Sequence, residues 1–495
     1  MRSRSLPSPT FLLCLACAAL VAVPLWLHRW LPIQDLPQHL ATLRVVHDVH
    51  TGTAPAAGVY VTHLGSTQYL LFYIVGDLLS YLVSVRTAGL LIMTSYMLGT
   101  VAAAYALLRS LGRDPRLCLL AVPLLTNSQL LIGLLQFVIG IPLMLYGWSL
   151  ALDTVRRWRR RSAVGLAIVA VLVFYSHVVV FGIFGIGLAV IAPWGSLRRL
   201  VRYWVPIVPV GIAVVYWAFF TASGDFVRNA ITSGTENKDL WPFWVSCRAM
   251  YELAFDTYRD SADEKLFAMF VVTAVALTVL ARRDHARPVV STARWLLIPL
   301  ACAVLYFRSE GTNGFLGHIR DRFVLLAVMA MLPTFRMPRG VLGHLGTVAM
   351  VVISYMTAET FQWHLTRFER EDVGDFSAAL DHIPPDRRVA GLIFESESRY
   401  FGQNPFLHYP SYYLVERGGR VNFSFAGYPH WPFGYRPHQD PLGASPPTFL
   451  WEWQPWRVQT EDLAASYDYV LTRGDGFDAP DTFWKSWEGT DWAVW

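Results

Sequence analysis

The architecture of this protein follows from two neighbouring stretches near its N-terminus, TFLLCLACAALVAVPLWL (10–27) and IQDLPQHLATLRVVHDVH (33–50). The first is apolar throughout and close to the roughly 20 residues that a helix needs to cross a bilayer. We interpret it as an uncleaved membrane anchor. The second begins where the chain leaves the membrane, and it places Asp35 and His39 one helical turn apart. Because an acid is costly at this depth, Asp35 is the leading candidate for a catalytic residue.

Asp35 also has a structural interpretation. An Asp followed by Pro37 and Gln38 is typical of the start of a helix, with Asp as the N-cap, Pro in the first turn and Gln three residues on. Capping alone and capping combined with chemistry are therefore both open.

The composition indicates a membrane protein. The chain of 495 residues is 54% hydrophobic and 16% charged, whereas a soluble globular chain carries about 25% charge. Apolar stretches recur from residue 10 to residue 360 and then stop, and the remainder is rich in Tyr, Trp, Pro and charge. We therefore predict a polytopic α-helical membrane body over residues 1–360 and a soluble α/β domain over residues 361–495.

Charge and cysteine content exclude several classes. The net charge is +5, but the arginines are distributed among loops rather than gathered into a patch, so we expect no nucleic-acid partner. All of the five cysteines except Cys247 lie in or beside apolar spans. They predict neither a disulfide framework nor a metal site.

The arginines also predict a topology, because cytoplasmic loops carry the excess of basic residues. Candidate cytoplasmic clusters are Arg2 and Arg4, residues 109–116, 156–161, 198–202, 282–287 and 336–339. All can be cytoplasmic only if residues 66–84, with Asp77 at their centre, do not cross. We interpret that segment as an interfacial or re-entrant helix that closes a first outer loop, residues 29–86, carrying amphipathic helices. The expected spans are then residues 10–28, 87–108, 117–133, 134–153, 163–177, 178–195, 203–220, 266–281, 293–307, 321–335 and 341–360.

This arrangement of about 11 spans has a consequence for sidedness. The N-terminus is then cytoplasmic. The Asp35 loop, the loop 221–264 and the soluble domain 361–495, hereafter the tail, share the outer face of the plasma (inner) membrane. The tail is then exoplasmic, either periplasmic or extracellular.

The tail alternates between helix and strand signals. The pattern predicts helix at 375–383, strand at 388–394, a helix that ends at Gly418 and Gly419, strand at 420–426, a helix-to-strand step over 462–473 and a final strand at 492–495. Such alternation is typical of a small, partly parallel sheet.

A second polar cluster lies in the outward-facing stretch RSEGTNGFLGHIRDRF (308–323), which contains His318, Arg320 and Arg322. Guanidinium groups bind oxyanions in a bidentate manner and stay charged, so they suit a lipid phosphate. Snorkelling to head groups, or ion pairing with Asp321, are the structural alternatives. At another outer turn, His177 is interpreted first as a structural hydrogen-bonding residue and second as a substrate contact.

Several short motifs are similar to those of a known superfamily. The opening DLPQHLA (35–41) resembles the Asp-x-Pro-x-His opening of poorly characterised bacterial relatives of the GT-C integral membrane glycosyltransferases. The segments TNSQLLIGLLQFVIGIPLML (126–145), YSH (175–177) and GHIRDRFVLLAVMAMLP (317–333) also resemble segments found there, as does the layout of the membrane body. The fold class expected is therefore a GT-C-like polytopic α-helical membrane protein with an exoplasmic α/β domain.

The resemblance implies transfer of a sugar from a polyprenyl-phosphate carrier to a glycan, lipid or protein acceptor. Asp35 would act as general base, and the substrate-binding residues would be His39, His177, His318, Arg320 and Arg322. Many members carry a second acid or a DxD-like metal motif, whereas this chain has Leu36 beside Asp35. We therefore expect no cofactor, and a divalent metal is not indicated.

Two other classes compete with an enzyme. A polytopic transporter or lipid flippase is the first, although the mid-span segments are nearly free of the charges that ion coupling needs. A non-catalytic envelope-assembly protein is the second. Replacing Asp35 by Asn discriminates among them, because it should abolish transfer, leave a scaffold almost unaffected, and affect a transporter only if Asp35 lines its path.

Overall fold

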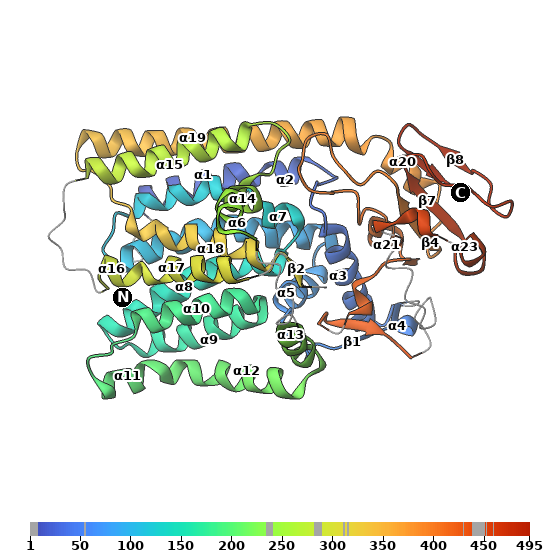
Figure 1. Cartoon of the computed structure of the whole chain (residues 1–495). Helices are drawn as coiled ribbons and strands as arrows, with labels where there is room; N and C mark the ends of the chain where they lie inside the picture. Colours follow the sequence, from blue (N-terminus) through green and yellow to red (C-terminus); the bar gives the residue numbers. More distant parts are fainter. Residues whose placement is uncertain are drawn as a thin grey trace. The chain divides into compact units, whose positions relative to one another are not determined.

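The computed structural model describes residues 8–53, 56–233, 241–281, 290–309, 312–313, 316–428, 430–437, 451, 453–458 and 460–495. The protein is mainly helical, with a small sheet region near the C-terminus (Figure 1). It forms two compact units. Unit 1 comprises Met1–Pro24, Met93–Gln129 and Leu135–Gln362, and unit 2 comprises Leu25–Ile92, Leu130–Leu134 and Trp363–Trp495.

The helices up to residue 233 are α1 (Pro9–Ala22), α2 (Pro24–Leu27), α3 (Leu36–Thr51), α4 (Ala56–Val59), α5 (Leu71–Ser80), α6 (Val85–Ser110), η1 (Pro115–Leu124), α7 (Ser128–Ile132), α8 (Leu135–Arg156), α9 (Arg160–Ser176), α10 (Val178–Ile191), α11 (Leu197–Trp204), η2 (Val205–Ile207), α12 (Val208–Phe220) and α13 (Ala222–Ser233). The later helices are α14 (Phe243–Phe255), α15 (Ala262–Leu280), α16 (Thr292–Trp295), α17 (Leu297–Arg308), α18 (Ile319–Met331), η3 (Leu332–Thr334), α19 (Val341–Arg367), η4 (Phe368–Val373), α20 (Phe376–Asp381), α21 (Ser411–Arg417), η5 (Phe425–Gly427), η6 (Pro455–Arg457) and α23 (Thr460–Ser466). The strands are β1 (Tyr60–Thr62), β2 (Thr312–Asn313), β3 (Leu316–Gly317), β4 (Arg388–Ile393), β5 (Arg420–Val421), β6 (Phe433–Tyr435), β7 (Tyr469–Arg473), β8 (Trp487–Glu488) and β9 (Trp492–Val494).

Within the described residues, five helical segments are long and apolar enough to cross a membrane: Pro9–Leu27, Val85–Ser110, Leu135–Arg156, Leu197–Phe220 and Val341–Val373. They correspond to five of the expected spans. The other expected spans appear as shorter, interrupted or end-charged helices. The expected span 117–133, for example, is divided into η1 and α7, because Pro123 inside η1 removes a backbone donor and favours a tighter 3-10 turn.

In unit 1, α8, α9 and α10 lie side by side (Figure 1). The indole N–H of Trp148 on α8 donates to the carbonyl of Phe184 on α10 at 3.1 Å. A Cβ at Gly187 would lie 2.1 Å from the Trp148 indole nitrogen, so only glycine allows this approach of the two helices. Close packing at small residues is how apolar helices associate where water does not drive them together.

The tail in unit 2 contains the expected small sheet. Its five strands run in the order β5-β4-β7-β9-β8, and they are drawn in orange to red in Figure 1. β4 is parallel to β5 and β7, whereas β9 is antiparallel to β7 and β8. The expected strand 420–426 is shorter than predicted, since only Arg420 and Val421 pair before the chain turns into η5.

The first loop packs with the tail inside unit 2. β1 pairs antiparallel with β6, Tyr60 opposite Tyr435. Helix α3 is joined to α21 by Gln38, whose side-chain amide donates to Ser411 Oγ at 2.6 Å and to the carbonyl of Phe423 at 2.9 Å. Neither association is visible in local sequence, because the partners come from opposite ends of the chain.

Residues 66–84 contain α5, a helix of ten residues. Its acid, Asp77, is buried, and each carboxylate oxygen lies 2.7 Å from a histidine nitrogen, Nδ1 of His47 or Nδ1 of His50. These histidines lie three residues apart on α3 and so face the same side. The two histidines of α3 therefore provide a partner for each oxygen of Asp77, which offsets the cost of burying this carboxylate in an apolar segment.

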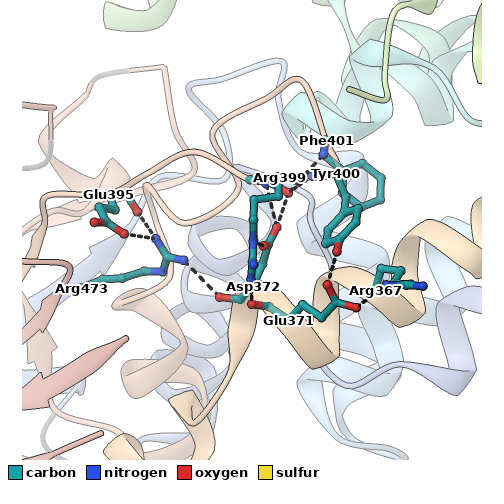
Figure 2. Close-up of polar contacts among 9 residues, drawn as sticks. Arg367, Glu371, Asp372, Glu395, Arg399, Tyr400, Phe401 and Arg473 are labelled. Atoms are coloured by element: carbon teal, nitrogen blue, oxygen red, sulfur yellow. Dashed lines mark hydrogen bonds and ion pairs between the residues drawn. The ribbon is translucent and has the colours of Figure 1, made fainter. Parts of the chain in front are cut away.

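A polar network joins the end of the last long helix to the sheet (Figure 2). Asp372, in the π-helical segment η4, accepts from the backbone N–H of Arg399 at 2.9 Å and from its Nε at 2.7 Å. Arg473 of β7 donates to the carbonyls of Asp372 and Glu395, with its guanidinium carbon 3.7 Å from the centre of the Phe406 ring. Burial lowers the pKa of Arg473, although nearby carboxylates oppose the shift.

Candidate functional site

Asp35 occupies the N-cap position of α3, but its side chain makes no capping hydrogen bond. Its backbone N–H donates to the carbonyl of Ile132 at 3.0 Å, and Gln34 makes the equivalent bond to Leu131 at 2.8 Å. The backbone therefore holds the residue in place while the carboxylate is available for another role. The interpretation in which the Asp35 side chain serves only as a cap does not fit this geometry.

Gly133 lies against Asp35 within unit 2. Its φ of +95° is in the region that favours glycine, and a Cβ there would lie 2.7 Å from the Cβ of Asp35. The chain can pass this close to the backbone and Cβ of Asp35 only because position 133 has no side chain.

His408 is the nearest basic partner of Asp35. Its Nε2 lies 3.2 Å from Asp35 Oδ1, and the imidazole is almost fully buried while 20% of the Asp35 side chain is exposed. The ring of His408 stacks on Phe423, with centroids 5.1 Å apart and planes 16° apart, and it meets Phe425 edge-on at 6.0 Å. Asp35 is thus a reachable carboxylate beside a rigidly packed imidazole.

His39 also lies beside Asp35 on α3, but the structure gives both of its ring nitrogens partners inside the protein. Nε2 lies 2.8 Å from the carbonyl of Gly133, and Nδ1 lies 2.7 Å from the Tyr73 hydroxyl. A carbonyl only accepts, so Nε2 carries the proton and Nδ1 accepts from Tyr73. Burial lowers the pKa of His39 to about 4, although the charge of Asp35 opposes the shift. His39 is therefore neutral at pH 7 and supports the architecture around Asp35.

Aromatic rings also pack against His39. Phe425 and Trp431 stack on each other with centroids 4.0 Å apart and planes 12° apart, and the His39 ring lies 5.7 Å and 5.4 Å from them. Aromatic faces are good surfaces for sugar rings and for polyprenyl chains alike. Trp431, which is only partly buried, is the ring of this pair that remains accessible.

The predicted arginines lie in unit 1, at the start of α18. Arg320 is almost completely buried, with its guanidinium carbon 4.4 Å from the ring centre of Trp241 and 4.7 Å from that of Tyr306. Its Nη2 donates to Ser246 Oγ. Among the described residues, Nε and Nη1 have no hydrogen-bond partner. A permanently charged group with unused donors between two aromatic rings is suited to an oxyanion.

Arg322 and His177 both contact Phe137 in unit 1. The Arg322 guanidinium carbon lies 5.9 Å from the ring centre, and the His177 ring meets the same phenyl edge-on at 5.4 Å. His177 separates α9 from α10 and caps α10, because its Nδ1 accepts from the backbone N–H of Val179 at 3.1 Å. The structural hydrogen bond expected of His177 is therefore present.

His318 is engaged with the neighbouring acid. Its Nδ1 lies 2.8 Å from Asp321 Oδ2, and its backbone has a φ of 59°, which is uncommon for a residue with a side chain. The ion pair that the structure describes for Asp321 is the one with His318. Glu310, in the same outer stretch, lies outside the described residues.

One group of acids in unit 1 has ligand atoms close enough to share a cation. Oxygen atoms of Asp256, Asp263 and Glu264 lie within 4.8 Å of one another, as found among the described residues. One oxygen of Asp263 already accepts from the backbone N–H groups of Thr257 and Tyr258. Burial, followed by the charge of Asp263, raises the pKa of Asp256. This group was not singled out from the sequence.

No protein-family model matches this chain, and neither the curated proteins nor the solved structures contain a match. The candidate site therefore stands on its geometry. Asp35 and His39 lie beside each other in unit 2, whereas His177, His318, Arg320 and Arg322 belong to unit 1, where His177 and Arg322 share a contact with Phe137. His408 was missed by sequence reasoning, since a lone histidine in FLHYPSYY carries no motif that links it to Asp35.

Proposed function

We propose that this protein is a membrane glycosyltransferase of the GT-C type that moves a sugar from a polyprenyl-phosphate carrier to an acceptor at the outer face of the membrane. Asp35 is the general base, and Arg320 and Arg322 hold the phosphate of the carrier. The acceptor is a glycan, a lipid or a protein with a free hydroxyl group.

The observation that carries this proposal is the state of the Asp35 carboxylate. It stands at a helix start, where an aspartate ordinarily caps, yet it makes no capping bond and remains partly exposed. A general base must be able to reach the hydroxyl whose proton it takes. The Asp35 carboxylate meets that requirement, because it is partly exposed and makes no capping bond while the backbone N–H of the residue is hydrogen-bonded to Ile132.

The leaving group makes a different demand. The bond between the anomeric carbon and the phosphate oxygen breaks with its electron pair on oxygen, so the carrier departs as an anion and needs no general acid. It needs positive charge and hydrogen-bond donors. Arg320, with two guanidinium nitrogens unused among the described residues, supports this role.

The membrane arrangement is part of the proposal. We propose about 11 crossings, a cytoplasmic N-terminus and an outer-face tail, with the shorter helices of unit 1 completing the set. The packing of residues 25–92 with the tail in one compact unit supports placing the Asp35 loop and the tail on the same side. The plasma membrane is the expected location.

The proposal is tested with the purified protein in detergent and a panel of synthetic farnesyl-phosphate-linked hexoses and pentoses. Envelope glycolipids, glycans and proteins serve as acceptors, and release of farnesyl phosphate is followed by mass spectrometry. We expect Asp35→Asn to lower the rate by about 100-fold or more, because it removes the base but keeps the shape.

Asp48→Asn is the matched control, since Asp48 lies on the same helix but pairs with Arg44 at 2.7 Å. It should retain the activity of the wild-type protein. If the wild-type protein releases no farnesyl phosphate from any donor, or if Asp35→Asn is as active as the control, the enzyme assignment is wrong. A transporter, a flippase or an assembly protein then becomes the better description.

A further inference from the structure

The carboxylate of Asp35 is held asymmetrically. Oδ1 lies 3.2 Å from His408 Nε2 and 3.4 Å from the side-chain nitrogen of Gln34. Among the described residues, no hydrogen bond reaches Oδ2. One oxygen is therefore directed toward the protein interior, and the other is left to meet a substrate.

His408 is packed so that its nitrogen cannot easily turn away. The imidazole is buried, lies parallel to Phe423 and meets Phe425 edge-on. Its backbone carbonyl accepts from the N–H of Ser411 at the start of α21. Stacking on one face, an edge contact and a turn in the backbone together restrict the ring to one position.

Asp35 and His408 lie just before the starts of α3 and α21, and these two helices are joined three residues further along. Gln38 on α3 donates to Ser411 Oγ on α21 and to the carbonyl of Phe423, the residue on which His408 stacks. The separation of Asp35 and His408 therefore depends on buried hydrogen bonds rather than on two flexible side chains.

We infer that His408 is a positioning residue for Asp35: its Nε2, 3.2 Å from Oδ1, holds that oxygen through a charge-assisted N–H contact and leaves Oδ2 facing the acceptor hydroxyl. This inference rests on the proposed function. In the transfer, the acceptor oxygen bonds to the anomeric carbon, its proton goes to Oδ2, and the phosphate leaves with the electron pair of the broken bond. His408 touches neither substrate and remains protonated on Nε2 throughout.

Two substitutions of His408 test the contribution of its N–H group and that of its aromatic ring independently. His408→Gln keeps an N–H donor at about the reach of Nε2, whereas His408→Phe keeps the stacking on Phe423 and removes the donor. The experiment measures kcat and KM for transfer from the farnesyl-phosphate-linked sugars, together with the thermal unfolding midpoint of each variant.

We expect His408→Phe to lower kcat roughly tenfold to 100-fold with little change in KM, because a misdirected carboxylate still leaves substrate binding intact. His408→Gln should recover most of that loss. In the Asp35→Asn background, His408→Phe should have no further effect, since the group that it positions is gone.

His382→Phe is the matched control. His382 also stacks on an aromatic ring, that of Trp487 at 5.3 Å and 23°, and it does not contact Asp35. It should leave kcat unchanged. If the wild-type protein transfers sugar and both His408 variants match it, or if both lose activity only in proportion to their lost stability, the positioning role is wrong. A wild-type protein inactive on every donor instead overturns the proposed function itself.

Discussion

Two aspartates that lie near opposite ends of α3 differ in how many of their carboxylate oxygens have a partner. At its N-terminal end, Asp35 has one oxygen beside His408 and the other without a bond among the described residues, and 20% of its side chain is exposed. Near its C-terminal end, Asp77 of α5 has both oxygens occupied, by His47 and by His50. Both acids are paired with histidine, but only the second is saturated. A carboxylate that keeps one oxygen without a hydrogen bond can still react with a substrate, whereas one with both oxygens bonded has a structural role. The presence of a histidine partner alone does not distinguish the two.

The largest expected effect concerns His39, which lies between these acids. Its pKa is lowered to about 4 in the folded protein, compared with 6.5 for an ordinary histidine. Above pH 6.5 neither state binds the proton, whereas between pH 6.5 and 4 only the unfolded chain does. Stability should therefore fall with falling pH across this window, by up to about 3 kcal/mol.

Thermal unfolding in detergent at pH 7.5 and pH 4.5 measures this loss. His39→Phe removes the titrating group, so its stability should depend less on pH than that of the wild-type protein. The buried His430, whose pKa burial also lowers to about 4, contributes equally to both proteins. Equal slopes for the variant and the wild type would contradict the prediction.

The second prediction applies one conservative change to both acids. Asp35→Glu moves the carboxylate outward by one methylene and should lower kcat by about 100-fold, because a displacement of about 1 Å is enough to misalign a base. Asp77→Glu should leave kcat per folded molecule unchanged. Sugar transfer, corrected for the folded fraction, measures both, and equal losses would remove the distinction between the two acids.

The third prediction concerns the close approach of the chain to Asp35. Gly133→Ala places a Cβ 2.7 Å from that of Asp35, at a φ of +95° that alanine adopts poorly. We expect a loss of about 2 kcal/mol in unfolding free energy and a drop in activity greater than stability alone explains. Denaturant unfolding and kcat are the measurements. Gly65→Ala, where nothing lies within 4 Å, is the control.

The fourth prediction tests the saturated acid. Asp77→Ala removes the partner of both His47 and His50 and leaves two partly buried N–H groups without an acceptor. Because some solvent reaches these histidines, the expected loss is about 1 to 2 kcal/mol. Denaturant unfolding measures it. A variant as stable as the wild-type protein would show that α5 is held to α3 by apolar contacts alone.

The smallest expected effect is that of Asp48→Asn, which weakens a partly exposed i,i+4 pair with Arg44 on α3. Such pairs contribute about 0.3 to 0.5 kcal/mol. The same unfolding measurement should show a loss in this range that decreases with added salt. A loss as large as that of Asp77→Ala would indicate that Asp48 has partners beyond Arg44.

Local patterns predicted much of the architecture. The run of apolar stretches indicated a membrane protein, and the helix and strand signals of the tail predicted α20, β4, α21, β7 and β9 close to their observed positions. Boundaries were less accurate. The last long helix continues to Arg367 and then as η4, and the i,i+4 pair Arg367–Glu371 at 2.7 Å supports this extension past the apolar part.

The candidate site was predicted only in part. Asp35 and the arginines could be chosen because acids and bases near a membrane are rare and costly. His39 was chosen for the same reason, but the structure gives it internal partners. The pairing of Asp77 with His47 and His50 was not predicted, although their spacing of three residues already placed both histidines on one face of a helix.

The sequence by itself determined the class of the protein, the alternation of elements in its tail and the choice of Asp35, because hydrophobicity, helix signals and charge placement are local properties. Only the tertiary structure decided whether the oxygens of that carboxylate have partners inside the protein or remain accessible to a substrate. His408 reaches it from the far end of the chain, through the packing of α3 on α21. A contact of this kind depends on how buried surfaces fit together, and no local pattern encodes it.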